Sequence, residues 1–212
     1  MHTIVNSVPM YIYKPHYDKI ELLCGKDVPD GAYNNEYFYC VAGAFTGKGY
    51  EKGFNHKLIA GDHVSDGVRY NVYPCERNTG AFEYYNGHYV FLYLHYTHKL
   101  DLAARGKGMG FAQEMIIHNG LLLQTTRDDG NQNKFRALCE IDDALCVVET
   151  QKPISFGAYK DYLQVLHVTE ALYLDMGGWS YSWYRDEAGE LHRRFPNNRE
   201  FLTNALVFVG SK

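Results

Sequence analysis

This 212-residue chain is short of several features that would assign it to a class at once. No apolar run approaches the roughly 20 residues that a membrane-spanning helix requires, so no membrane span is predicted. The first seven residues have neither the basic start nor the apolar centre of a signal peptide. No repeat, low-complexity tract or Ser/Gly/Pro linker divides the chain, which predicts a single domain over residues 1–212. The net charge of -4 excludes a broad electrostatic attraction to nucleic acid.

Metal-binding patterns are missing as well. The five cysteines include no CxxC pair, so the spacing of a zinc site is absent. Cys139 and Cys146 flank Asp142-Asp143 and are expected to face each other across a hairpin, as free buried thiols, because cysteine behaves as a small hydrophobe. The ten histidines form no HExxH or HxH pattern. We therefore predict no metal and no other cofactor.

Tyrosine and tight turns are abundant. The 19 tyrosines favour strands, although tyrosine rings also line sugar-binding sites. Asn-Gly is the strongest short hairpin signal, because both turn residues adopt positive φ. The sequence predicts four hairpins, with strands at 81–85 and 88–94, 111–118 and 121–125, 135–141 and 144–150, and 179–185 and 191–195.

The clearest helix is expected at 156–167. Ser155 is a good N-cap, and the apolar residues that follow recur on one face of a helix. A weaker helix is expected at 100–105. The predicted fold class is α+β, a single domain with one large, mostly antiparallel sheet built from hairpins and few helices. The apolar stripe comprises Phe156, Tyr159, Leu163 and Leu166.

The segment 172–182 is the most informative part of the sequence. An apolar strand ends at Asp175, and two glycines and a hydroxyl follow. Consecutive amides in a glycine turn form an anion-binding nest, which suits an anionic or sugar-like ligand. The alternative is an ordinary turn in which Asp175 accepts local backbone hydrogen bonds. The turn residues in question are Gly177, Gly178 and Ser180.

Four further segments stand in order along the chain: Val-Ala-Gly-Ala-Phe at 41–45, Phe-Arg-Ala-Leu at 135–138, Leu-Asp-Met-Gly-Gly-Trp-Ser at 174–180 after the predicted helix, and Arg-Glu-Phe-Leu-Thr-Asn-Ala at 199–205. In this order they resemble motifs of the phosphodiester glycosidase family. The resemblance covers about residues 36–209. Met176 stands where the family has the first glycine of a triplet, and Trp179 stands where it has a serine.

This resemblance implies a hydrolase that cleaves a sugar-1-phosphodiester. Asp175 would be the carboxylate that activates water or attacks the sugar. Arg136 would clamp the phosphate, since guanidinium pairs bidentately with phosphate oxygens. The alternative for Arg136 is a salt bridge to Glu140 or another carboxylate. The amides of Gly177 and Gly178 and the hydroxyl of Ser180 would complete the anion cradle.

Further candidates come from the strand patterns and the motif-like segments. Alternation places Glu114 and His118 on one face of a strand, where an acid and an imidazole could handle protons, although Glu114 could instead lie on a solvated face. Trp179 shares a face with Tyr181 and Trp183, either as core packing or as a stacking platform for a sugar. Gly43, Phe45 and Arg199 complete the predicted substrate-binding residues.

Three functions remain open at this level. The leading one is hydrolysis of the glycosidic C–O bond of a sugar-1-phosphodiester. The second is a non-catalytic carbohydrate-binding protein that retains the fold, and the third is a phosphodiesterase that cleaves P–O. The expected partner is a carbohydrate or sugar phosphate, and no oligomeric state is predicted. Family members are commonly secreted or periplasmic, so this location is expected if a leader has been removed, and the cytoplasm otherwise.

Overall fold

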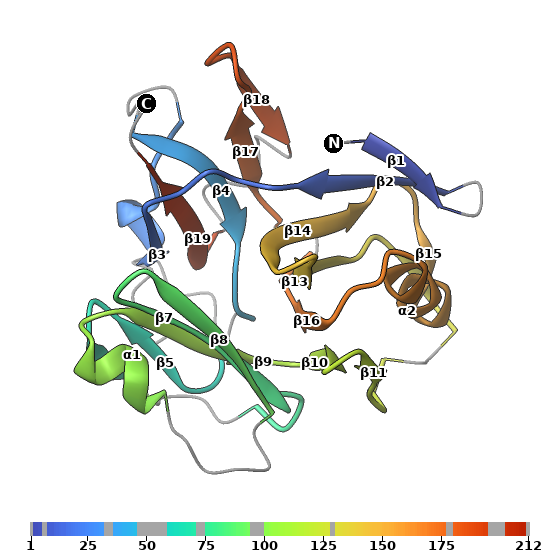
Figure 1. Cartoon of the computed structure of the whole chain (residues 1–212), viewed down its shortest axis with the longest axis horizontal. Helices are drawn as coiled ribbons and strands as arrows, with labels where there is room; N and C mark the ends of the chain where they lie inside the picture. The colour runs from blue at the N-terminus through green and yellow to red at the C-terminus, as the bar shows by residue number, and fades with distance from the viewer. Residues whose placement is uncertain are drawn as a thin grey trace.

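The computed structural model describes residues 2–5, 8–31, 36–45, 59–70, 75–93, 100–127, 130–176, 180–194 and 202–210. Strands dominate this part of the chain, and every strand pairing in it is antiparallel (Figure 1). Within the described ranges, no helix is long and apolar enough to cross a membrane.

The largest sheet has seven strands in the order β1-β2-β14-β13-β16-β10-β11. Residues far apart in sequence meet in it, because the N-terminal hairpin pairs with a central one. Its strands are β1 His2–Val5, β2 Val8–Tyr13, β10 Met115–His118, β11 Leu121–Leu122, β13 Arg136–Ile141, β14 Ala144–Thr150 and β16 Glu170–Tyr173.

Two five-stranded sheets and a two-stranded one complete the β-structure. The first, in the order β18-β17-β4-β19-β3, comprises β3 Lys19–Cys24, β4 Tyr37–Ala42, β17 Ser182–Arg185, β18 Leu191–Arg194 and β19 Asn204–Val209. The second, in the order β6-β5-β9-β7-β8, comprises β5 His63–Ser65, β6 Val68–Tyr70, β7 Gly80–Tyr85, β8 His88–Tyr93 and β9 Met109–Gln113. The small sheet pairs β12 Gln132–Asn133 with β15 Ile154–Ser155.

The predicted hairpins are confirmed where the structure describes them. Asn86-Gly87 joins β7 to β8, with φ of 49° and 79°, as a turn that matches strand twist requires. Asn119-Gly120 joins β10 to β11, and Asp142-Asp143 joins β13 to β14. The fourth hairpin joins β17 to β18. Cys139 and Cys146 are directly opposite in the third hairpin, as buried free thiols.

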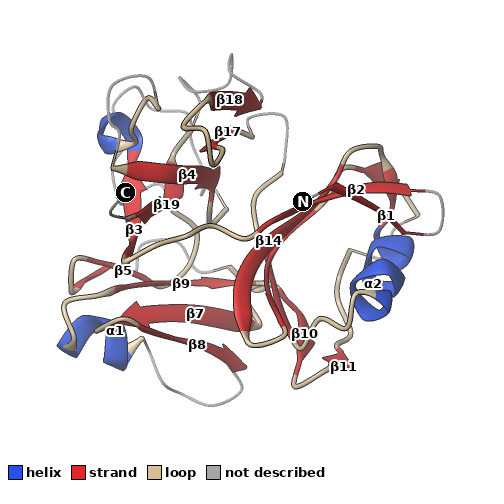
Figure 2. Ribbon diagram, turned by 45° about the horizontal axis from the view of Figure 1, so that its top comes forward, coloured by secondary structure: helices blue, strands red, loops and turns tan. Residues whose placement is uncertain are grey.

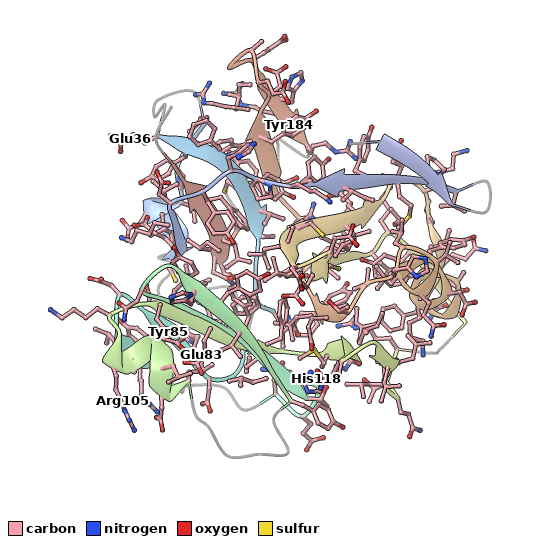
Figure 3. The ribbon with its side chains drawn as sticks, in the orientation of Figure 1. Glu36, Glu83, Tyr85, Arg105, His118 and Tyr184 are labelled. Carbon is pink, nitrogen blue, oxygen red and sulfur yellow. The ribbon has the colours of Figure 1, made fainter. Side chains whose placement is uncertain are left out.

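Both predicted helices are present, and within the described residues they are the only α-helices: α1 spans Asp101–Arg105 and α2 spans Phe156–Val165. The Ser155 hydroxyl caps α2 by accepting from the Ala158 amide at 3.2 Å, while η1 (Gly25–Asp27) is a 3-10 turn. The helix α2 lies against one face of the seven-stranded sheet (Figure 2). The carboxylate of Glu83 on β7 is buried against α1, where it accepts from the Ala103 amide at 2.5 Å (Figure 3).

The main core lies where the three large sheets meet. In β13, Leu138 points into this shared core, whereas its neighbours Ala137 and Cys139 point outward under α2. Because strand side chains alternate, Arg136 belongs to the inward face with Leu138. Several strands are buried on both faces and therefore read as continuous apolar runs instead of alternating ones.

Two expectations about the sheet are wrong. The strands form several sheets instead of one large sheet, so the described chain is a β-rich fold with few helices. The segment 111–118 is not one strand, because it breaks at Glu114. β9 lies before the break in one sheet, and β10 lies after it in another. Apolarity alone did not mark the break, because both halves are buried on both faces.

Candidate functional site

Segments from distant parts of the sequence converge at Asp175. The Asp175 amide donates to the Gly43 carbonyl at 2.8 Å, and the Leu174 amide donates to the Arg136 carbonyl at 3.0 Å. Asp175 follows β16, Gly43 follows β4 and Arg136 opens β13, so three strand ends meet here. Asp175 is half-buried.

Asn204, at the start of β19, fixes the segment after β4. Its side-chain oxygen accepts from the Ala44 amide at 2.8 Å, and its side-chain nitrogen donates to the Ala44 carbonyl at 2.9 Å. A Cβ on Gly43 would lie 2.7 Å from the same Asn204 oxygen, too close for any other residue without movement. Gly43 is therefore required by this close approach, and the segment carrying Phe45 is held in one position.

Arg136 is fully buried, and its five N–H donors all have acceptors. Nε and Nη2 donate to Glu149 Oε2 at 2.9 and 2.7 Å, and Nη1 donates to the Ser180 hydroxyl at 2.9 Å. The remaining contacts, both at 3.3 Å, are from Nη1 to the Asp175 carbonyl and from Nη2 to the Ser182 hydroxyl. Arg136 thus holds both Asp175 and Ser180.

This environment favours the salt-bridge interpretation of Arg136 over a phosphate clamp. The partner is Glu149, directly opposite in the hairpin, and not Glu140, which accepts from Tyr89 and Thr169. Burial opposes the charge of Arg136, but the surrounding groups, Glu149 first among them, outweigh it and the pKa of the guanidinium rises. Glu149 also accepts from Arg194 on β18 at 3.0 Å, so the ion pairs join two sheets.

Glu114 lies in the break between β9 and β10, with a side chain that is 2% exposed. A solvated face is therefore wrong for this residue. One carboxylate oxygen accepts from the Thr126 amide and hydroxyl at 3.1 and 3.3 Å, and the other is paired with Arg127 Nε. Its partner in the structure is thus an arginine and not a histidine.

The Arg127 guanidinium lies over two aromatic rings. Its central carbon is 3.9 Å from the centre of the Tyr173 ring and 4.7 Å from that of Phe45. Burial raises the pKa of the Tyr173 hydroxyl to about 12; the Arg127 cation lowers it and the Asp175 carboxylate raises it. Phe45, Tyr173 and Asp175 therefore form one neighbourhood around a cation that the sequence did not indicate.

His118 lies at the other end of β10 from Glu114. Four residues of extended chain span about 13 Å. His118 Nδ1 is 2.9 Å from Glu170 Oε2, its ring stacks on Tyr93, and Figure 3 marks its position. The expected proton-handling pair of Glu114 and His118 is thus not formed, because each has a different ionic partner.

The remaining candidates divide into two groups. Tyr181 and Trp183 are buried in the core on one face of the β4–β17–β19 sheet, which supports packing and not a sugar platform for these two. The Ser180 hydroxyl is also buried and lies 3.4 Å from Met176 Sδ. Four predicted site residues lie outside the described residues: Gly177, Gly178, Trp179 and Arg199.

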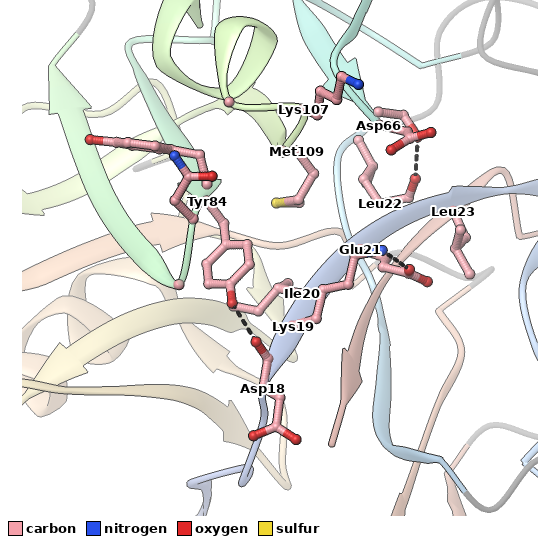
Figure 4. A pocket seen from close by; sticks show the side chains of 16 residues that line it. Asp18, Lys19, Ile20, Glu21, Leu22, Leu23, Asp66, Tyr84, Lys107 and Met109 are labelled. Carbon is pink, nitrogen blue, oxygen red and sulfur yellow. Dashed lines mark hydrogen bonds and ion pairs between the residues drawn. The ribbon is translucent and has the colours of Figure 1, made fainter. Parts of the chain in front are cut away.

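A cavity of about 530 Å³ opens between β3 and the turns after β5 and β7 (Figure 4). Tyr84 closes one side of it by donating from its hydroxyl to the Asp18 carbonyl at 2.8 Å. Lys19 and Glu21 form an ion pair at its rim. None of the residues that line this cavity belongs to the neighbourhood of Asp175.

Within the described ranges, one group of three side chains has the spacing of a metal site. The ligand atoms of Asp186, Glu190 and His192 lie within 4.8 Å of one another on the β17–β18 hairpin. His192 Nε2 is 2.8 Å from Asp186 Oδ2, and this bond holds the pKa of Asp186 below its usual value. The group also serves the turn itself, because Asp186 accepts from the Glu190 amide.

Sequence reasoning missed Arg127, Glu149 and Asn204. Arg127 belongs to no periodic segment and no motif. Glu149 was visible as a charge within an apolar strand, and Asn204 was inside a motif-like segment from which Arg199 was chosen instead. A charged or amide side chain among apolar strand residues was the signal for the last two, because such groups are buried only with partners.

The fold is that of a β-rich domain in which strand ends from distant parts of the sequence converge on Asp175. No family model and no curated protein matches the sequence. The catalytic domain of zebrafish N-acetylglucosamine-1-phosphodiester alpha-N-acetylglucosaminidase, auto-inhibited by its pro-peptide, is similar in structure, with a TM-score of 0.63 and 12% identity. The similarity covers 100% of this chain and 81% of that one.

A hypothetical protein from Synechocystis is also similar, with a TM-score of 0.56 and 12% identity, over 99% of this chain and 61% of that one. At such identities the likeness shows a common fold and does not by itself transfer an activity.

Proposed function

We propose that this protein is a hydrolase that cleaves the glycosidic C–O bond of a sugar-1-phosphodiester. The observation that carries the proposal is the meeting of Gly43, Arg136 and Asp175 at adjacent strand ends, with Asn204 holding the segment after Gly43. These residues come from the segments that resemble the motifs of one enzyme family. The structural likeness to a phosphodiester glycosidase catalytic domain supports the same conclusion.

The proposed reaction requires one productive carboxylate. In a sugar-1-phosphodiester the leaving group is a phosphate monoester, which is far less basic than an alkoxide and needs less protonation. Asp175 would activate water or attack the anomeric carbon. Its half-buried position suits this role, because a carboxylate is more effective where water is partly excluded.

The other site residues would bind the substrate. We assign the amides of Gly177 and Gly178 to the anion cradle and Trp179 to the sugar ring. Arg136 would act by holding the Ser180 hydroxyl and the Asp175 carbonyl in place, and not by touching the phosphate. The remaining proposed contributors to substrate binding are Gly43, Phe45, His118 and Arg199, whereas Glu114, whose carboxylate is held by Thr126 and Arg127, would not touch the substrate.

A non-catalytic carbohydrate-binding protein is the second candidate. The observation that favours it is the buried Met176 side chain directly after Asp175. Its sulfur lies 3.4 Å from the Ser180 hydroxyl, at the position where the family has a glycine with no side chain. A side chain at this position would leave sugar binding possible while it removes the room for an attacking water.

The test uses 4-nitrophenyl diesters of a panel of hexose and N-acetylhexosamine 1-phosphates, with added phosphatase to release colour from 4-nitrophenyl phosphate. We expect turnover that Asp175→Asn lowers roughly 10²–10⁴-fold. Asp161→Asn, at an exposed position on α2, is the matched control and should leave turnover unchanged. Sugar binding without turnover, equal in Asp175→Asn, would support the carbohydrate-binding candidate.

The bond that breaks is identified in ¹⁸O-labelled water. Label in the sugar means C–O cleavage, as proposed. Label in the phosphate means P–O cleavage, and the protein would then be a phosphodiesterase.

A further inference from the structure

One donor in the neighbourhood of Asp175 has no acceptor. Arg127 Nη2 is buried and makes no hydrogen bond within the part of the chain that the structure describes. Each such nitrogen carries two N–H groups, and buried donors in proteins almost always have a partner. A buried guanidinium edge without an acceptor is the arrangement expected where a ligand supplies the oxygen.

The position of this guanidinium is fixed in advance. Glu114 holds Nε, and Thr126 in turn holds Glu114 through its amide and its hydroxyl. The rings of Tyr173 and Phe45 lie against the guanidinium. The side chain is 16% exposed, so part of it is accessible from outside while its other contacts are made.

The same rings connect Arg127 to the reacting centre. Tyr173 lies two residues before Asp175, and Phe45 lies two residues after Gly43, whose carbonyl accepts from the Asp175 amide at 2.8 Å. The guanidinium is therefore packed on the two segments that carry the proposed site. By contrast, Arg136 has all five donors occupied and is fully buried, so it has no donor left for a ligand.

From these contacts we propose that Arg127, and not Arg136, binds the phosphate group of the substrate, an inference that rests on the function proposed above. Guanidinium matches phosphate oxygens in geometry and charge. Glu114 is then a positioning residue that orients Arg127. Sequence motifs do not single out either Arg127 or this division of roles between the two arginines.

Arg127 would act on the bond that breaks. Water forms a new bond from its oxygen to the anomeric carbon, and one of its protons passes to the Asp175 carboxylate. The bond between the anomeric carbon and the phosphate oxygen breaks, and its electron pair stays on that oxygen. The phosphate monoester gains negative charge, which a fixed cation stabilises more than it stabilises the diester.

The first measurement is binding of inorganic phosphate and glucose-1-phosphate to the full chain by calorimetry. We expect Arg127→Met to weaken both about 10- to 100-fold and Arg127→Lys to weaken them less, because lysine keeps the charge but not the bidentate geometry. Arg105→Met is the matched control, with a side chain that is 80% exposed on α1, and should bind as the wild type does. Equal affinities in the Arg127→Met and wild-type proteins would overturn the inference.

A second measurement needs no substitution. In the wild type, the side-chain ¹⁵N–¹H signals of Arg127 should shift as phosphate is added, while those of Arg136 should move less. A shift confined to Arg136, or no phosphate binding by the wild type, contradicts the inference even if Arg127 variants fold poorly.

The outcomes separate this inference from the proposed function. Phosphate binding that depends on Arg127, without hydrolysis of any diester, would support the phosphate site and refute the proposed hydrolase activity. Hydrolysis that depends on Asp175, with phosphate affinity and kcat/KM unchanged by Arg127→Met, would support the hydrolase activity and refute the phosphate site at Arg127. For Glu114→Gln, an orienting role predicts weaker phosphate binding with an unchanged pH profile of turnover, since the proton passes to Asp175.

Discussion

Glu149→Gln should be among the most damaging conservative substitutions in this protein. The substitution keeps the shape of the side chain and removes its charge. Arg136 is fully buried and its ionic partner is Glu149, one oxygen of which accepts two hydrogen bonds from the guanidinium, at 2.9 and 2.7 Å. Without that carboxylate, a guanidinium remains in the interior with its charge uncompensated.

The magnitude follows from the burial of each partner. Breaking a fully buried ion pair by neutralising one side costs about 3–5 kcal/mol, a large share of the roughly 5–15 kcal/mol that stabilises a typical domain. Arg194, the other partner of Glu149, has a 22% exposed side chain and can be hydrated. Arg194→Met should therefore cost only about 1 kcal/mol. For a chain of this length, Glu149→Gln should lower Tm by roughly 6–20 °C.

Urea unfolding of the wild type, Glu149→Gln, Arg136→Met and the double variant measures these effects. The double variant should lose less free energy of unfolding than the two single variants lose together, by more than about 1 kcal/mol, because it removes both charges at once. A loss below 1 kcal/mol in Glu149→Gln, or additive effects in the double variant, would show that Arg136 is not held by this pair.

Three further predictions concern other parts of the chain. Gly43→Ala should lose about 1–3 kcal/mol in urea unfolding, since the added Cβ meets the Asn204 side chain at 2.7 Å, whereas Gly157→Ala, with open space around it in α2, should not destabilise the protein; equal stabilities would refute the contact. Burial raises the pKa of Glu83 above its usual value, so the contribution of Glu83 to the free energy of unfolding should be largest below about pH 4.5 and fall as the pH rises through the folded-state pKa. Glu83→Gln should remove this fall when stability is measured across pH, and an unchanged pH dependence would contradict the assignment. A thiol reagent at pH 7.5 should modify Cys75 rapidly and the four buried cysteines only after unfolding, and rapid reaction of a Cys75→Ser variant would contradict this burial.

Local signals in the sequence predicted the local structure well. The turns at Asn86-Gly87, Asn119-Gly120 and Asp142-Asp143 were predictable because positive φ favours few residue types, and the two-residue turn then sets the register of its strands. The N-cap of α2 at Ser155 was predictable because it depends on residues three positions apart.

The division into sheets was not predictable in this way. The segment 111–118 is apolar throughout, and nothing in it distinguishes the strand in one sheet from the strand in the next. Only the packing of both faces places Glu114 at the crossing between them.

The sequence by itself determined that strands and hairpins dominate, where the main helix begins, and that Asp175 follows an apolar strand, because these properties depend on neighbours along the chain. The tertiary structure alone decided which charges are paired. In the folded chain every donor of Arg136 has an acceptor, whereas Arg127, beside Phe45 and Tyr173, keeps one buried donor without an acceptor among the described residues. The physical reason is that an ion pair depends on distance in space, and the partners of these arginines are set by which strand ends the packed sheets bring together.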